Sequence, residues 1–383
     1  MSSKKESILF IATPNESSSI LKSPEFSSKF NIINYTLNTI DNFLEFLKNH
    51  NGDNIVAIYG GYPAFSPIGG LTRSLLEHPH FPKHTLKCIV LCSRGYNGID
   101  LEALKDHGIK LFNYQDDEID ENTIVKDFKK GLVGNDVADC VMWHLLEGFR
   151  KFSYQQRVTR ESKDTLTARS NTCGKPGYAF GHELGQMINR NSTLYTESPR
   201  GKKCLILGLG SIGKQIAYKI DHGLGMEVHY SKRTEDIEIT QMYPNWTYHP
   251  FNDTLLEKLD MFHSIVISLP GTPETHHLIN EKFLSHCKAG ELILVNIGRG
   301  NILELSAVKN AINEGIIRHL GVDVFYNEPT IDNDILIDDR LTTITPHIGS
   351  STKDVFSQSC DNALSNIFNI SLDQNFTSYS RIV

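Results

Sequence analysis

Three glycines in the middle of the chain, Gly208, Gly210 and Gly213, have the spacing of a dinucleotide-binding turn. They follow the short apolar run 204–207, which is typical of a buried strand. In such a turn the first glycine permits the sharp bend from strand to helix, the second lets backbone N–H groups approach a pyrophosphate, and the third lets the helix pack closely on the strand. The spacing therefore predicts a site for a nicotinamide or flavin dinucleotide.

Three further motifs follow along the chain, and each carries a side chain that could act on a substrate. Arg299 stands in a Gly-Arg-Gly turn, Glu328 precedes a proline, and His347 lies in the run Thr-Pro-His-Ile-Gly. Hydride transfer to a keto acid needs a cation for the carboxylate and carbonyl, a proton donor, and a group that keeps the donor protonated. A guanidinium, an imidazole and a carboxylate could meet these needs if their loops follow neighbouring parallel strands.

The motifs resemble those of the D-isomer-specific 2-hydroxyacid dehydrogenase family, which includes glyoxylate and hydroxypyruvate reductases and phosphoglycerate dehydrogenases. The matching segments are Asn-Ile-Gly-Arg-Gly at 296–300, Gly-Val-Asp-Val-Phe at 321–325 and Thr-Pro-His-Ile-Gly at 345–349. The resemblance extends over about residues 88–351. It implies that Arg299 binds the substrate, that His347 donates the proton, and that Glu328 orients and stabilises the imidazolium. Formate dehydrogenases of this superfamily use glutamine at the position of Glu328, so formate is not the expected substrate.

The resemblance also implies contacts to the substrate carboxylate and to the cofactor. The segment 93–100 resembles a loop that binds the carboxylate through backbone N–H groups, so Arg94 and Gly95 are predicted substrate contacts. Arg94 replaces a residue that is usually small, and it would narrow the pocket or add a cation. Asp323 resembles the aspartate that holds the nicotinamide carboxamide. The full set of predicted cofactor contacts is Gly208, Gly210, Ser211, Ile212, Gly213, Ser231, Lys232, Arg233, Pro270, Thr275, Ile297, Asp323 and Gly349.

The residues after the second strand of the nucleotide fold indicate which cofactor is preferred. NAD-specific folds place an acidic residue there, about 20 residues beyond the glycines, where it binds the ribose 2′-OH. This chain reads Tyr-Ser-Lys-Arg-Thr at 230–234, with no acid before Glu235. These residues suit a 2′-phosphate, so the prediction is NADPH-dependent reduction of a small 2-keto acid such as glyoxylate or hydroxypyruvate. Two alternatives stay open, an NAD-linked 2-hydroxyacid dehydrogenase and a nucleotide-sensing, corepressor-like binding protein on the same fold.

Apolar runs of strand length alternate with helical stretches, which predicts an α/β protein with two doubly wound, Rossmann- or flavodoxin-like parallel-sheet domains separated by a cleft. A substrate-binding domain is expected over 1–133, completed by 350–383, and an NAD(P)-binding Rossmann domain over 134–349. The polar segment 153–200 is expected to be a long surface connection that contains a little helix. The expected strands are 8–12, 55–59, 88–92, 205–207, 226–230, 265–269, 292–295, 320–324 and 343–345, and the expected helices are 101–107, 137–152, 214–223 and 353–368.

Composition excludes several classes of partner. A net charge of −7 and a pI near 6.1 leave no basic field for nucleic acid, and the longest apolar runs are too short to cross a membrane. Seven scattered cysteines without a C-x-x-C pair predict a reducing compartment and no metal site. Because only five apolar residues, 8–12, follow the N-terminus, no signal peptide is predicted and a cytoplasmic location is expected. The resemblance implies a homodimer.

Overall fold

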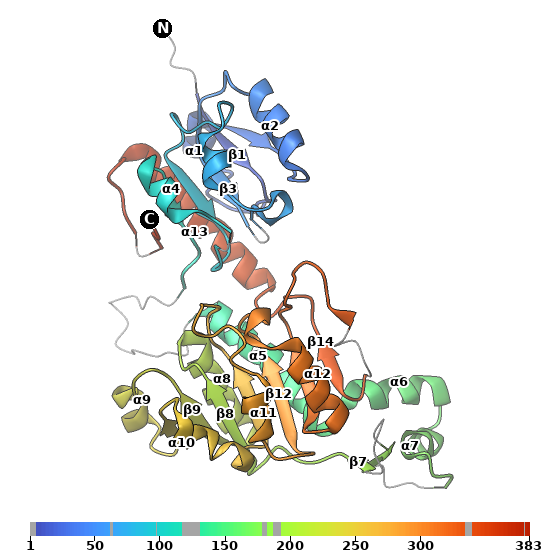
Figure 1. Cartoon of the computed structure of the whole chain (residues 1–383). Coiled ribbons are helices and arrows are strands. Elements are labelled where there is room, and N and C mark those ends of the chain that lie inside the picture. Colours follow the sequence, from blue (N-terminus) through green and yellow to red (C-terminus); the bar gives the residue numbers. More distant parts are fainter. Residues whose placement is uncertain are drawn as a thin grey trace. The chain divides into compact units, whose positions relative to one another are not determined.

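The computed structural model describes residues 5–61, 64–96, 98–116, 131–177, 182–186, 193–333, 339–378 and 380–383. The chain divides into two compact units, one formed by Met1–Asp120 with Ser351–Val383 and the other by Glu121–Ser350 (Figure 1). Each unit is built on a parallel sheet with helices on both faces. The predicted α/β, doubly wound fold is therefore confirmed.

The first unit contains a five-stranded parallel sheet in the order β2-β1-β3-β4-β5. Helices α2, α3 and α4 pack on one face of this sheet, and α1 and α13 pack on the other. Strands β3 and β4 are buried along their whole length, as expected for parallel strands that are covered on both sides. The elements are β1 (Glu6–Phe10), α1 (Pro24–Lys29), β2 (Phe30–Asn34), α2 (Ile40–Asn49), β3 (Ile55–Gly60), η1 (Ser66–Ile68), α3 (Arg73–Glu77), β4 (Cys88–Leu91), α4 (Leu101–Asp106), β5 (Lys110–Phe112) and α13 (Lys353–Leu372).

The C-terminal residues return to this first sheet. After α13 the chain runs back beside β5, where Ile382 N donates to Leu111 O at 2.8 Å and Asn113 N donates to Ser380 O at 3.0 Å. The unit is therefore closed by residues from both ends of the sequence.

The second unit contains a seven-stranded parallel sheet in the order β10-β9-β8-β11-β12-β13-β14. The order reverses between β8 and β11, and in open α/β sheets ligands bind outside the carboxyl ends of the strands at such a point. Helices α10, α11 and α12 cover one face, and α5 and α8 cover the other. The elements are α5 (Leu132–Arg150), β8 (Lys203–Leu207), α8 (Ser211–Leu224), β9 (Glu227–Ser231), α9 (Ile237–Met242), β10 (Thr247–His249), α10 (Asp253–Leu256), η2 (Leu259–Met261), β11 (Ser264–Ile267), α11 (Glu281–Ser285), β12 (Leu292–Asn296), η3 (Gly300–Ile302), α12 (Leu305–Glu314), β13 (Ile317–Val322) and β14 (Thr342–Ile344).

The segment 153–200, expected as a surface connection with a little helix, contains more regular structure than that. This segment contains α6 (Phe152–Ser162), α7 (Thr165–Cys173) and the antiparallel pair β6 (Glu183–Gln186) and β7 (Thr193–Tyr195). Helix α7 begins after Asp164, whose carboxylate accepts the N–H of Thr167 at 2.7 Å, and it ends at Gly174 in the left-handed conformation. Helix α6 buries only Val158 and has no side-chain cap at its start, so its sequence carries few signals of a helix.

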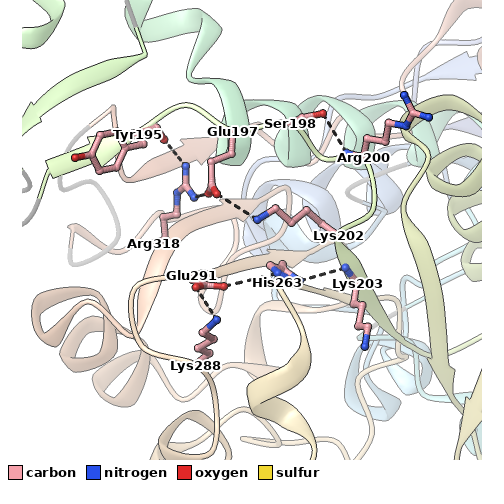
Figure 2. Close-up of polar contacts among 10 residues, drawn as sticks. All are labelled: Tyr195, Glu197, Ser198, Arg200, Lys202, Lys203, His263, Lys288, Glu291 and Arg318. Atoms are coloured by element: carbon pink, nitrogen blue, oxygen red, sulfur yellow. Dashed lines mark hydrogen bonds and ion pairs between the residues drawn. The ribbon is translucent and has the colours of Figure 1, made fainter.

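Ion pairs occupy the amino ends of the strands in the second sheet (Figure 2). The guanidinium of Arg318, at the start of β13, pairs with Glu197, and Glu197 also accepts from Lys202 at 3.2 Å, just before β8. The side chain of Glu291, before β12, pairs with Lys288 at 2.7 Å. These ion pairs lie at the amino edge of the sheet, opposite the carboxyl edge that carries the predicted site.

Among the described residues, no helix combines the length and apolar character that crossing a membrane requires.

Candidate active site

The glycine turn after β8 has the geometry that its spacing predicts. Gly208 has a φ of +100°, and a Cβ there would lie 2.7 Å from Ser268 O. A Cβ on Gly213 would lie 2.1 Å from the carbonyl oxygen of Gly208, so helix and strand approach too closely for any side chain. Gly210 precedes α8, contributes no side-chain cap, and has no heavy atom within 4 Å of its Cβ position. The first turn of α8, with Ser211 and Ile212, therefore offers backbone N–H groups to an anion.

The residues after β9 form a small charged cluster. Lys232 Nζ lies 3.2 Å from Asp236 Oδ2, and Lys214 Nζ approaches the same oxygen at 2.9 Å. Burial acts to raise the pKa of Asp236, but hydrogen bonds from Lys214, from the Ile239 N–H and from Lys232 lower it overall. Sequence reasoning missed Lys214 and Asp236, although Lys214 directly follows the third glycine. Arg233 is exposed beside this cluster.

The end of β9 fits a dinucleotide in one further respect. The hydroxyl of Ser231 is buried and has no hydrogen-bond partner among the described residues. A buried hydroxyl normally finds a partner. Together with the uncapped start of α8 and the open face of Gly210, it makes this end of the sheet suitable for a phosphate-bearing ligand.

Two other predicted cofactor contacts have structural roles that are visible without a ligand. Thr275 Oγ1 donates to Pro270 O at 2.7 Å and accepts from Thr272 N at 2.8 Å, so it holds the loop after β11. Ile297 directly follows β12 and is 8% exposed, and its N–H donates to Ile267 O at 3.1 Å. Both residues lie at the carboxyl edge of the sheet.

Arg299 lies in a tightly packed turn at the end of β12. The Asn296 side chain holds this turn, since its Nδ2 donates to Arg299 O at 2.9 Å and its Oδ1 accepts from Gly298 N at 3.0 Å. A Cβ on Gly300 would lie 2.0 Å from the carbonyl carbon of Phe325, which follows β13. The Arg299 turn is therefore pressed against the loop that leads to Glu328.

His347 and Glu328 are brought together from two loops. His347 Nδ1 lies 2.9 Å from Glu328 Oε2, and both side chains are partly exposed, at 31% and 23%. The second carboxylate oxygen of Glu328 accepts from Phe325 N at 2.9 Å. The carboxylate is thus held by its own loop while it orients the imidazole.

Asp323 fixes the turn on both sides of His347. Its Oδ1 accepts from Thr345 Oγ1 at 2.6 Å and from Ile348 N at 2.9 Å, and its Oδ2 accepts from Gly349 N at 2.8 Å. The Asp323 side chain is buried, and His347 between these bonds has a φ of +54°. The sequence indicated a cofactor contact at Asp323 but not its hold on the His347 turn, and Thr345 was missed.

The two predicted substrate contacts, Arg94 and Gly95, lie in the first unit, after β4. Ser93 Oγ donates to Gly95 O at 2.9 Å, and Asn113 Nδ2 donates to Arg94 O at 2.7 Å. The guanidinium of Arg94 pairs with Asp116, so its charge is matched by a carboxylate of its own unit. Residue 97 of this predicted loop lies outside the described residues.

Comparison with known proteins places these features in a family. The family model described as "D-isomer specific 2-hydroxyacid dehydrogenase, NAD binding domain" matches residues 181–349. A candidate 2-hydroxyacid dehydrogenase of Saccharomyces cerevisiae is 58% identical over 366 residues, which cover 96% of this chain and 94% of the relative. The chain belongs to the D-isomer-specific 2-hydroxyacid dehydrogenase family. Its members are NAD(P)-dependent oxidoreductases that act on small hydroxy acids.

More distant dehydrogenases of this family share parts of the sequence and the whole fold. A glyoxylate reductase of Pyrococcus horikoshii is 38% identical over 267 residues, covering 70% of this chain and 68% of the relative. The holo form of D-mandelate dehydrogenase from Rhodotorula graminis has a TM-score of 0.76 at 24% identity and covers 96% of this chain and 94% of its own. An NADPH-dependent glyoxylate/hydroxypyruvate reductase of Sinorhizobium meliloti, solved with NADP and malonate, has a TM-score of 0.71 at 20% identity and covers 99% and 97%.

Proposed function

We propose that this dehydrogenase reduces a small 2-keto acid, with glyoxylate or hydroxypyruvate as the leading candidates, to the D-2-hydroxy acid with NADPH. The observation that carries the proposal is the hydrogen bond between His347 and Glu328, beside the packed turn of Arg299. An imidazole oriented by a carboxylate is suited to protonate a carbonyl oxygen, and an arginine in the adjoining turn is suited to hold the substrate carboxylate.

The residues divide the work as follows. Arg299 binds the keto-acid carboxylate and polarises the carbonyl through its planar set of donors. Because His347 Nδ1 is bonded to Glu328, we assign proton donation to Nε2, and the charge of Glu328 stabilises the imidazolium until the proton leaves. The nicotinamide cofactor supplies the hydride when bound. We assign the nucleotide to the domain 134–349 and part of substrate binding to the domain 1–133 completed by 350–383, through Arg94 and Gly95.

The preference for NADPH is supported by the residues after β9. Ser231 supplies a buried hydroxyl, and Lys232, Arg233 and the neighbouring Lys214 supply positive charge for a 2′-phosphate. Asp236 balances part of this charge, so the site carries fewer unmatched cations than its sequence suggests. The Sinorhizobium meliloti reductase of the same fold was solved with NADP.

A substrate panel tests the proposed reaction. Initial rates would be measured for glyoxylate, hydroxypyruvate, pyruvate and a branched keto acid, each with NADPH and with NADH, followed by chiral analysis of a product such as D-lactate. We expect the highest kcat/KM for a small substrate with NADPH. Higher kcat/KM with NADH would favour the NAD-linked dehydrogenase. Nucleotide binding without turnover of any keto acid would favour the corepressor-like protein.

The double variant Lys232→Ala with Arg233→Ala tests the cofactor site separately. The KM for NADPH should rise by about 10- to 100-fold, since two charge-assisted contacts of about 0.7–1.4 kcal/mol each are lost, whereas the KM for NADH should change little. Lys258→Ala, an exposed lysine of the same unit, is the matched control. An unchanged ratio of the two KM values would remove the argument for a phosphate site.

We further propose that the enzyme is a homodimer that uses the α6–β7 segment. Phe152, Leu166 and Tyr195 of this segment are 45%, 58% and 44% exposed, which is unusual for such large apolar side chains on one excursion of the chain. Light scattering after gel filtration should give twice the mass of 43.1 kDa, and Leu166→Glu should reduce it. A monomeric wild type would contradict this. The cytoplasmic location stays a prediction from the sequence.

A further inference from the structure

A chain of buried polar side chains runs beneath the His347 turn in the second unit. Lys151 Nζ lies 2.6 Å from His319 Nδ1, and His319 Nε2 lies 3.0 Å from Thr343 Oγ1. Thr343 Oγ1 lies 2.8 Å from His144 Nδ1, and His144 Nε2 lies 3.4 Å from Thr345 Oγ1. Thr345 Oγ1 then donates to Asp323 at 2.6 Å. We call Lys151, His319, Thr343 and His144 the buried relay.

The fold explains why these side chains meet. Residues 319, 321 and 323 point to one face of β13 and its extension, and residues 343 and 345 point to the same face beside them, because Gly321 pairs with Thr343. Helix α5 packs on this face and carries His144, and Lys151 is its C-cap residue. A Cβ on Gly321 would lie 2.8 Å from the His144 ring, so the sheet is shaped to receive the imidazole.

The relay is deeply buried. Lys151, His319 and His144 are each 0% exposed, and Thr343 is 7% exposed. Burial lowers the pKa of His144 to about 3, and burial followed by the charge of Lys151 lowers the pKa of His319 well below its ordinary value. Both imidazoles are therefore neutral near pH 7, and a neutral imidazole has one donor and one acceptor nitrogen.

The groups at the two ends of this row of hydrogen bonds, Lys151 and Asp323, fix the direction in which its members donate. With Lys151 as the donor, His319 accepts on Nδ1 and carries its proton on Nε2, which donates to Thr343. Thr343 then donates to His144 Nδ1, His144 Nε2 donates to Thr345, and Thr345 donates to the ionised Asp323. All the bonds point from the ammonium to the carboxylate. The reversed direction would require Lys151 Nζ to accept and Asp323 to donate, whereas Thr345 Oγ1 donates to Asp323.

We propose that the members of the buried relay are positioning residues, which act through the Thr345 hydroxyl to hold the Asp323 side chain on the N–H groups of Ile348 and Gly349 and so fix the backbone turn that presents His347. The two oxygens of Asp323 accept from Ile348 N and Gly349 N while they accept from Thr345 Oγ1, so all three hydrogen bonds end on this side chain. The inference rests on the proposed function of His347 as the proton donor.

Ring tautomers test the direction of the chain without any turnover. In protein labelled with ¹⁵N-histidine, long-range ¹H–¹⁵N correlations assigned with single His→Gln variants distinguish Nδ1–H from Nε2–H. We expect His144 and His319 to be neutral and protonated on Nε2. An Nδ1–H tautomer or an imidazolium at either residue would overturn the proposed direction. A wild type that reduces no keto acid would instead count against the proposed function, while the tautomers would still decide the relay.

Breaking the row of hydrogen bonds at Thr343, between the two histidines, tests whether the relay affects catalysis. Thr343→Val keeps the shape of the side chain but removes the hydroxyl between the two histidines. We expect kcat to fall by about 10- to 100-fold with little change in the keto-acid KM, since a small displacement of the reacting group is enough for such a loss. Thr343→Ser should restore kcat to within about threefold, because the hydroxyl returns.

Thr342→Val, on the neighbouring residue of β14, is the matched control and should turn over as the wild type does. A Thr343→Val protein with wild-type kcat and wild-type tautomers would overturn the proposal. If Thr343→Val does not fold, the tautomers of the wild type and the activity of Thr343→Ser still test the proposal. A Thr343→Ser protein that folds, has lost the Nε2–H tautomers and keeps full kcat would contradict the relay.

Discussion

His347 Nδ1 is hydrogen-bonded at 2.9 Å to Glu328 Oε2, and the same carboxylate is anchored through its other oxygen to the backbone N–H of Phe325. The imidazole therefore receives its orientation from the loop that follows β13, not from its own loop. This coupling of two loops means that a substitution in one should be felt in the other.

Glu328→Gln should separate orientation from charge at this pair. A glutamine can still accept from Nδ1, but it cannot stabilise an imidazolium, so kcat should fall by about 100-fold, within the range for an impaired general acid. Steady-state kinetics with NADPH and a small keto acid would measure this, and the keto-acid KM should stay within a few-fold because Arg299 is unchanged. Glu314→Gln, an exposed carboxylate of α12, is the control. Wild-type kcat in Glu328→Gln would dismiss Glu328 from the mechanism.

Asp236→Asn should improve the use of NADPH. Asparagine keeps the helix cap that Asp236 provides to Ile239 N at 3.2 Å, but it no longer neutralises Lys214 and Lys232. Releasing partly exposed ion pairs of this kind, worth about 0.5–1 kcal/mol, should lower the KM for NADPH by about two- to fivefold and leave that for NADH unchanged. The measurement is the pair of KM values at fixed ionic strength, with Asp253→Asn as control. A higher KM for NADPH would show that the lysines need Asp236 to hold them in place.

Gly300→Ala should weaken substrate binding more than the small size of the added methyl group suggests. The new methyl group would meet the backbone of Phe325, so the Arg299 turn and the loop to Glu328 must move apart. Overpacking of this kind costs about 1–3 kcal/mol of stability, and the keto-acid KM should rise together with a fall in kcat. Gly290→Ala is the comparison, since a Cβ on Gly290 would meet no atom within 4 Å, although Gly290, unlike Gly300, has a positive φ of +83°. Substrate-binding losses as large in Gly290→Ala as in Gly300→Ala would show that the effect does not depend on the contact with Phe325.

Glu197→Gln should destabilise the second unit in a pH-dependent way. Burial acts to raise the pKa of Glu197, but the charge and hydrogen bonds of Arg318 and then Lys202 lower it below its ordinary value. A lowered pKa in the folded state means that the ionised carboxylate stabilises the fold above its ordinary range and loses this contribution as pH falls through the folded-state pKa. Because Arg318 is only 6% exposed, the variant should lose about 1–3 kcal/mol at pH 7.

Denaturant unfolding of wild type and Glu197→Gln between pH 7 and pH 3 would show the difference shrinking towards acid. Glu161→Gln removes an exposed pair with Arg157 on α6 and should change stability by about 0.5 kcal/mol or less. A difference that grows towards acid would contradict the sign of the pKa shift.

Much of the fold could be predicted because the decisive patterns are local. The apolar run at β8 and the glycines behind it specify strand, turn and helix within a dozen residues, and the short apolar runs of β11, β12 and β13 mark buried parallel strands. The α6–β7 segment could not be predicted in the same way. Helix α6 buries a single residue and has no side-chain cap at its start, and the cap of α7, Asp164, stands among many other polar residues.

The candidate site shows the same limit. Arg299, Glu328 and His347 lie in recognisable turns, so their types and spacing were enough to name them. Lys151, His319 and His144 carry no local signal, because their partners come from a helix and two strands that only the sheet order brings together. Asp236 was passed over for a similar reason, since only the folded loop shows that its charge falls between two lysines.

The pairing of residues 380–383 with β5 also sets an order of events during synthesis. The second unit is formed by one continuous segment of the sequence, so it can form its hydrophobic core as soon as that segment has left the ribosome. The N-terminal sheet is made first yet must wait for α13 and the last residues before its β5 edge is covered, so the nascent chain carries an open sheet edge throughout elongation.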